Sequence, residues 1–190
     1  MNPLFQHVYV LTMQNIFLFG LIVASIVTIL LKRKNSPYFF TSLPLFVLTF
    51  HQVDEYIISP ILLGDTYHFL NWAYRSGLEI SPAEVVFVNG FAYIPALILY
   101  LFKPSTKLFA LIFLFVNSAA LANGAFHLGV ATLQTDYSPG MVTALFLFIP
   151  LFIKSILLAS ERLASFRLIF ALSSYGFILH FIMIWLVNIY

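Results

Sequence analysis

Three ionisable side chains stand close together inside a long apolar segment of this sequence. They are His51, Asp54 and Glu55, and the segment runs from about residue 38 to residue 63. It is long enough to cross a bilayer as a helix. An aspartate near the centre of such a helix costs roughly 2.5–3.5 kcal/mol on insertion scales, so ionisable groups in this position indicate a functional site.

The spacing of these residues places them on one face of a helix. His51 and Glu55 are four residues apart, and Asp54 is three residues from His51. All three therefore fall within about 100° of the helix circumference. Two adjacent carboxylates in a low dielectric cannot both ionise without a cation, so they share a proton or flank a metal or a basic group. The structural alternative is a pair of protonated acids that hydrogen-bond neighbouring helices.

The composition identifies the broad class of protein. The sequence has 190 residues, of which 62% are hydrophobic and 8% are charged. These values are typical of a polytopic membrane protein, and we expect one transmembrane helical domain over residues 1–190. The sequence contains no cysteine, which excludes disulfides and thiolate ligands. Basic residues do not alternate with aromatic ones in a patch, so we expect no nucleic-acid partner.

The apolar segments predict an all-α, polytopic transmembrane bundle of about six spans. The third span opens with Ser81-Pro82-Ala83-Glu84, a capping box in which Glu84 is expected to be a cap rather than a catalyst. Pro95 and Pro150 predict kinks within their spans. The expected spans are residues 9–31, 38–63, 81–102, 108–130, 140–158 and 166–187.

The basic residues predict the orientation of these spans. Only Arg75 lies on one side of a six-span arrangement, and every other lysine and arginine lies on the opposite side. The positive-inside rule then places both termini on the non-cytoplasmic side. We therefore expect a multi-pass integral membrane protein, with Trp72 and its neighbouring tyrosines at the outer interface.

Polar residues from five of the spans lie at similar depths in the outer half of the bilayer. At about 1.5 Å per residue, Glu55 lies roughly 12 Å and Asn123 roughly 10 Å below the outer ends of their spans. Asn123 and His127 share a helical face, as His51 and Glu55 do. We expect these groups to line a single cavity: Gln14, Asn15, His51, Glu55, Asn89, Asn123, His127 and His180.

Imidazole and carboxylate groups on facing helices are the ligands of metal sites in bundle cores. The sequence predicts His51, Glu55 and His127 as ligands of a divalent metal ion, with Asp54 as a further ligand or general base. Zn, Fe and Mn all suit these groups. Asn89 and Asn123 would orient the ligands or hydrogen-bond between helices. For His127 alone, packing is an equal alternative, and for His180 packing is the expected role.

A second Ser–Pro pair precedes the fifth span. Ser138 as N-cap and Pro139 at the first helical position predict a helix start beside the proposed cavity. Its free N–H groups would suit an anionic lipid headgroup. An ordinary helix start is the alternative.

Several of these residues together resemble a known family. They are the motif His51-x-x-Asp54-Glu55, the pair Asn123-x-x-x-His127 followed by Gly129, and the stretch Tyr137-Ser138-Pro139-Gly140-Met141-Val142-Thr143. The sequence is similar to the HXXEE-motif family of small bacterial integral membrane proteins, whose function is unknown. The resemblance implies a location in a bacterial cytoplasmic membrane. The sequence departs from the family motif at Asp54, where the motif has glutamate, and the shorter side chain of Asp54 reaches less far.

These observations support four functional hypotheses. The first is an intramembrane metal-dependent enzyme, a hydrolase or an oxidase, acting on a lipid or another apolar substrate. The second is a metal-free isomerase that uses Asp54 and Glu55 as acid and base. The third is a proton- or cation-linked transporter, although the polar layer does not continue inward. The fourth is a bis-histidine haem protein, for which two adjacent carboxylates would be an unusual environment.

Overall fold

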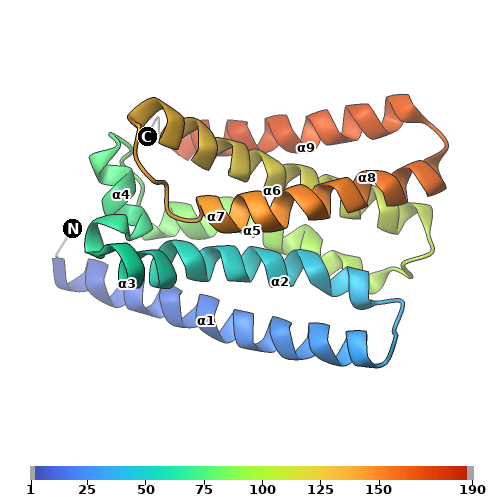
Figure 1. Ribbon diagram of the computed structural model, residues 1–190, viewed down its shortest axis with the longest axis horizontal. Coiled ribbons are helices and arrows are strands. Elements are labelled where there is room, and N and C mark those ends of the chain that lie inside the picture. Colours follow the sequence, from blue (N-terminus) through green and yellow to red (C-terminus); the bar gives the residue numbers. More distant parts are fainter. Residues whose placement is uncertain (1–2, 188–190) are drawn as a thin grey trace.

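The computed structural model describes residues 3–187, and every regular element in that range is helical. The helices lie roughly parallel to one long axis (Figure 1). Helix α1 lies at one edge beside α2, and α9 lies at the other edge beside α6 and α8. The longer helices are α1 (Pro3–Arg33), α2 (Phe39–Val53), α5 (Pro82–Ile98), α6 (Lys107–Gln134), α8 (Ile149–Leu163) and α9 (Phe166–Val187).

Short helical elements complete the chain at the ends of these helices. The π-helical turn η1 (Asp54–Ile58) and α3 (Ser59–Leu63) continue α2, and α7 (Met141–Thr143) and the π-helical turn η4 (Ala144–Phe148) lead into α8. The 3-10 turn η2 (Asp65–Tyr67) and helix α4 (Phe69–Arg75) connect α3 to α5, and the 3-10 turn η3 (Leu99–Leu101) follows α5. The capping box expected at Ser81 is present, with Glu84 bonded back to the Ser81 N–H.

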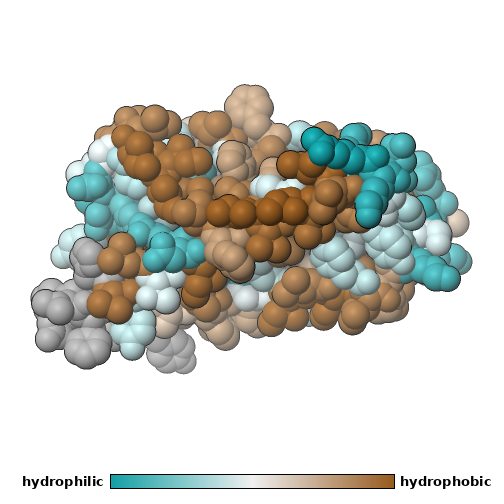
Figure 2. Space-filling view, turned by 90° about the horizontal axis from the view of Figure 1, so that it is seen from below, coloured by the Kyte–Doolittle hydropathy of each residue, from teal (hydrophilic) through white to brown (hydrophobic). Residues whose placement is uncertain are grey.

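Five of the described helical segments are long and apolar enough to cross a membrane. Hydrophobic residues cover the middle of the face in Figure 2, and hydrophilic ones gather toward its two ends. The chain is therefore a polytopic helical bundle of the kind found in multi-pass membrane proteins. The five segments are Val8–Arg33, Pro82–Leu101, Lys107–Gln134, Met141–Leu163 and Phe166–Leu186.

The helical segment Phe39–Leu63 is not among these five, although it is about as long. It carries the polar stretch from His51 to Glu55, which lowers its mean hydropathy. In the bundle it packs against α1, α5 and α6, so its polar face is buried between apolar neighbours. The sequence predicted a span at residues 38–63. The structure shows a continuous helical segment of sufficient length there, but its composition is less apolar than that of the five candidate spans.

Two prolines account for the two π-helical turns. Pro60 and Pro150 each follow a turn of this kind by two residues. A proline within a helix has no N–H to donate, and its ring clashes with the carbonyl four residues earlier. For Pro60 that carbonyl belongs to Tyr56, and it accepts a hydrogen bond of 2.8 Å from Gln14 Nε2 on α1 instead. The sequence predicted a kink at Pro150 and none at Pro60, and π-helical turns of this type are frequent at functional sites.

Candidate metal centre

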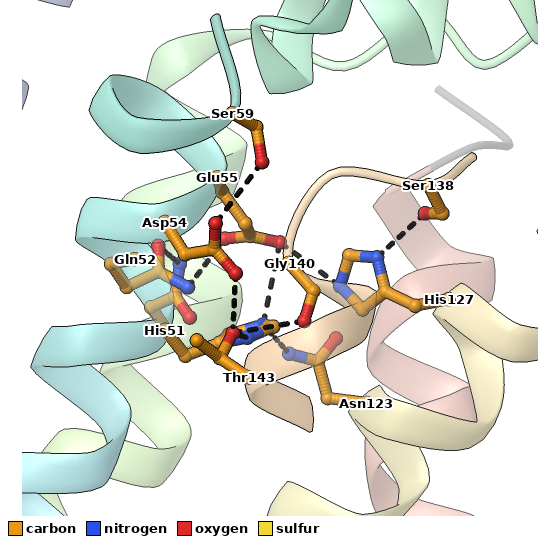
Figure 3. A network of polar contacts seen from close by, with 11 residues as sticks. His51, Gln52, Asp54, Glu55, Ser59, Asn123, His127, Ser138, Gly140 and Thr143 are labelled. Carbon is orange, nitrogen blue, oxygen red and sulfur yellow. Dashed lines mark hydrogen bonds and ion pairs between the residues drawn. The ribbon is translucent and has the colours of Figure 1, made fainter. Parts of the chain in front are cut away.

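The site begins with two residues on consecutive turns of one helix. His51 lies near the end of α2, and Glu55 lies in the π-helical turn that follows. His51 Nε2 is 3.4 Å from Glu55 Oε1, as Figure 3 shows. Both side chains are almost fully buried. The predicted shared face is therefore present.

Helix α6 supplies the third group. His127 Nε2 lies 2.9 Å from the same oxygen, Glu55 Oε1, and the imidazole is fully buried. One ligand atom from each of His51, Glu55 and His127 lies within 4.8 Å of the other two. These three residues form a buried group that could hold a metal ion, as the sequence predicted.

The contact distances around Glu55 Oε1 are close to those between neighbouring ligands of a metal ion. His127 Nε2 forms no hydrogen bond within the described part of the chain, despite its short distance to Glu55. Metal–nitrogen bonds of 2.0–2.1 Å in a tetrahedral zinc site place neighbouring ligand atoms about 3.3 Å apart. The His51–Glu55 distance of 3.4 Å matches that spacing. The His127–Glu55 distance would have to lengthen by about 0.4 Å on metal binding.

Two hydroxyl groups hold the far side of the two imidazoles. His51 Nδ1 is 2.9 Å from Thr143 Oγ1, and His127 Nδ1 is 2.8 Å from Ser138 Oγ. The Thr143 hydroxyl donates to Asp54 Oδ2 at 2.8 Å or to the Gly140 carbonyl at 2.9 Å, neither of which can donate in return. Thr143 must therefore accept from His51 Nδ1–H, which leaves the lone pair of the His51 ring on Nε2.

Asp54 lies behind His51 rather than beside the three ligands. Its carboxylate accepts hydrogen bonds from Ser59 Oγ at 3.1 Å and from Thr143 Oγ1 at 2.8 Å. The structure does not bring Asp54 into the group that could hold the metal, where the sequence had placed it. It is instead linked to His51 through the Thr143 hydroxyl, an arrangement that orients a ligand.

Amide side chains occupy the remaining side of the site. Gln52 Nε2 donates to Glu55 Oε2 at 2.7 Å, and Asn89 Nδ2 donates to Gln52 Oε1 at 2.9 Å. Asn123 Nδ2 lies 2.9 Å from His51 Nε2, so this amide uses the lone pair that a metal would need. Asn89 and Asn123 thus lie beside Gln52 and His51, and their predicted role in orienting ligands stays a prediction. Gln52 was missed, although its position next to His51 in the motif was a signal.

The predicted helix start at Ser138 is wrong. Helix α7 begins at Met141, and Gly140 is its N-cap residue with a φ of 83°. Ser138 does not cap this helix because its hydroxyl bonds to His127. A Cβ added to Gly140 would lie 2.6 Å from His51 Cε1 and 2.7 Å from Glu55 Cγ. Glycine is required here both for the left-handed backbone and for the close approach to the ligands.

A small cavity lies beside Glu55. Its volume is about 50 Å³, enough for a few water molecules, and Gln52, Asn89 and Asn123 also line it. His180 of α9 lies in its wall, and its Nε2 has no hydrogen-bond partner among the described residues. The sequence favoured a packing role for His180, but its position gives it access to anything that occupies this cavity.

Helix α4 closes the outer side of the site. Trp72 stacks on His127 with ring centroids 6.3 Å apart. The sequence predicted an interfacial position for Trp72, and the structure buries its side chain among other residues. Tyr67 donates a 2.9 Å hydrogen bond to Asp136, which joins this connection to the end of α6. Because that bond favours the neutral phenol, it raises the pKa of Tyr67.

The fold and the site define an all-α membrane bundle with a buried His–Glu–His group. Residues 42–155, more than half of the chain, match the family described as "protein of unknown function with HXXEE motif", and the chain belongs to that family. No curated protein and no solved structure matches the chain.

Proposed function

We propose that the chain is a membrane-embedded, metal-dependent enzyme whose divalent ion is held by His51, Glu55 and His127. The observation that carries the proposal is the convergence of two imidazole Nε2 atoms on one buried carboxylate oxygen. A divalent ion there, with Glu55 and the nearby Asp54, would bring the total charge to zero. That balance offsets the cost of burying two carboxylates. Zn, Fe and Mn all suit such ligands.

The surroundings of the site favour an enzyme with a small reaction chamber. A divalent ion would supply Lewis-acid polarisation of a substrate oxygen. Gln52 holds Glu55 Oε2, and Thr143 and Ser138 hold the two imidazoles, so this chain fixes its ligands before any substrate arrives. His180 lies in the cavity wall with a free Nε2, where it could exchange a proton with the substrate.

Two alternatives receive less support from the same geometry. An acid–base isomerase would need Asp54 and Glu55 on one substrate, but Ser59 and Thr143 cover the Asp54 carboxylate, and Asp54 does not line the cavity. A transporter would need a polar path through the inner half. There the bundle is filled by an apolar cluster that includes Leu48, Phe109 and Phe113.

We further propose that Phe39–Leu63 is a sixth span and that both termini lie outside the cytoplasm. The start of α1 and the end of α9 lie at the same end of the bundle in Figure 1, together with α4. The basic residues Lys32 and Lys154 lie over Phe39 and Phe40, at the start of α2 and far from the polar site. This distribution of positive charge supports a multi-pass protein of a bacterial cytoplasmic membrane.

Metal analysis tests the proposed function. The detergent-purified protein, expressed in metal-replete medium, is expected to carry about one transition-metal ion per chain. Glu55→Ala and His127→Ala should each lose it, because each removes a ligand. Glu161→Ala, which removes an exposed carboxylate remote from the site, is the matched control and should retain it. A metal-free wild type, or full metal content in both ligand variants, would contradict the proposal.

A further inference from the structure

A large apolar groove lies between α1 and α5, with part of α2 at its base. Its volume is about 860 Å³, within the range of sites that bind small molecules. Side chains such as Ile16 and Phe17 of α1 and Val86 of α5 line it. The groove exists partly because two of its residues have no side chain, Gly20 and Gly90, and a Cβ on Gly90 would meet no atom within 4 Å.

The groove has the length of one bilayer leaflet. Its lining on α5 runs from Ser81, at the outer end of that helix, to Tyr93. Twelve residues of helix span about 18 Å, against about 15 Å for half of the hydrocarbon core. An extended hydrocarbon chain that enters from the outer interface would therefore fit along it.

One polar side chain joins this groove to the candidate metal centre. Asn89 lines both the groove and the small cavity beside Glu55. Its amide donates to Gln52 Oε1, and Gln52 in turn donates to Glu55 Oε2. An amide in contact with hydrocarbon costs free energy unless its polar atoms have hydrogen-bond partners. Asn89 is half-buried in an otherwise apolar wall, and its partner lies on the side away from the groove. Asn89 is thus the boundary between an apolar compartment and a polar one.

We propose that the groove binds one acyl chain of an outer-leaflet membrane lipid and presents it to the metal centre at Asn89. The groove faces the bilayer, so the surrounding lipid is the occupant available to it, and its polar end at Ser81 lies where lipid headgroups begin. Asn89 lies about 12 Å below Ser81 along α5, so the part of the lipid at the site is the chain rather than the headgroup. This assignment rests on the proposed function only for the role of the bound lipid, and the binding itself does not depend on the metal.

Filling the groove tests the proposal. The protein is reconstituted into phosphatidylcholine nanodiscs that contain phosphatidylglycerol with a diazirine on one acyl chain, and after illumination the labelled peptides are identified by mass spectrometry. Labelling is expected to concentrate on α1 and α5 residues of the groove, above that of the equally exposed α9 residue Phe170. Gly90→Phe should reduce the groove labelling about tenfold, because its ring occupies the space of the chain.

A matched variant and a second blocking variant keep the result interpretable. Gly129→Phe also adds a ring to a helical glycine with no atom within 4 Å, but on α6 outside the groove, and it should label as wild type. If Gly90→Phe fails to fold, Val86→Trp blocks the groove from a position already exposed to the bilayer. Equal labelling of Phe170 and the groove, or unchanged labelling in the blocking variant, would overturn the proposal.

Metal content separates this proposal from the proposed function. Gly90→Phe should lose the lipid label and keep its metal, whereas Glu55→Ala should lose its metal and keep the lipid label. A protein that labels in the groove but never holds a metal would leave the lipid site standing and overturn the enzyme. A protein that holds a metal but labels uniformly would leave the metal site standing and overturn the lipid site.

Discussion

In the orientation that we propose, the outer half of the bundle buries two imidazoles, two carboxylates and a set of hydroxyl and amide partners, whereas the inner half buries aromatic and aliphatic side chains. In the outer half His51 and His127 are fully buried. Both ring nitrogens of His51 lie within hydrogen-bonding distance of polar side chains, and His127 Nδ1 lies 2.8 Å from Ser138 Oγ. In the inner half Phe109 and Phe113 stack with ring centroids 5.4 Å apart. The inner half therefore provides packing, and the outer half accepts the cost of buried polar groups to position a site.

The largest expected change in stability comes from the inner half. Phe113→Ala removes a fully buried ring from the apolar cluster, and the resulting cavity should lower the free energy of unfolding by about 3–5 kcal/mol. Metal content per folded chain should not change, because the ring touches no ligand. Thermal unfolding in detergent and metal analysis on the same sample measure both. Phe170→Ala on the exposed face of α9 is the control, and a loss of metal in folded Phe113→Ala would break the division into two halves.

A single methyl group at Gly140 should affect stability less and the site more. Gly140→Ala adds a Cβ 2.6 Å from His51 Cε1 to a residue with a φ of 83°. The left-handed backbone costs about 1–2 kcal/mol, and the displaced imidazole adds about 1–3 kcal/mol. Gly77→Ala has a similar φ of 78° with open space around it, and it isolates the backbone part. Equal unfolding midpoints and equal metal contents for the two variants would show that Gly140 has no special contact with the ligands.

The smallest expected change in stability comes from removing one hydroxyl. Thr143→Val keeps the shape of the side chain but removes the link between His51 Nδ1 and Asp54. Metal affinity should fall about 10- to 100-fold, as measured by competition with a chelator. The free energy of unfolding should fall by about 1–3 kcal/mol, because two buried groups lose a partner. Thr143→Ser restores the hydroxyl and should restore the affinity. If serine and valine behave alike, the hydroxyl does not orient His51.

The features of this molecule that depend on local sequence could be predicted. The features that depend on how each helix is turned about its axis toward its neighbours could not. The last span was expected at residues 166–187 and is observed as Phe166–Val187, because apolar composition and length determine a span. The His51–Glu55 pair followed from helical spacing, and His127 followed from its depth. Asp54 was expected beside the ligands, but its carboxylate accepts hydrogen bonds from Ser59 and Thr143, and spacing along one helix does not predict the partner from another helix.

Thr143 and Gly140 show a second limit of the sequence. Both contact His51, which lies about 90 residues earlier in the chain, and no periodicity predicts such a contact. Their place in the stretch Tyr137–Thr143, which was noted only for its resemblance to the family, was the available signal. The Ser–Pro pair instead suggested a helix start, because Ser138 has the same preference for a cap whether or not a histidine lies nearby.

The composition of Phe39–Leu63 has a consequence for how the protein is made. This segment carries two of the three proposed ligands, His51 and Glu55. It is the long helical segment of the described chain that falls short of the apolar composition of the other five. A ribosome-bound translocon releases segments into the lipid according to their hydrophobicity, and His51, Asp54 and Glu55 all oppose release. If the segment is the sixth span that we propose, we expect it to leave together with α1, whose Gln14 binds the Tyr56 carbonyl, as a helical hairpin. The catalytic chemistry that we propose thus makes membrane insertion of the ligand-bearing helix dependent on the helix before it.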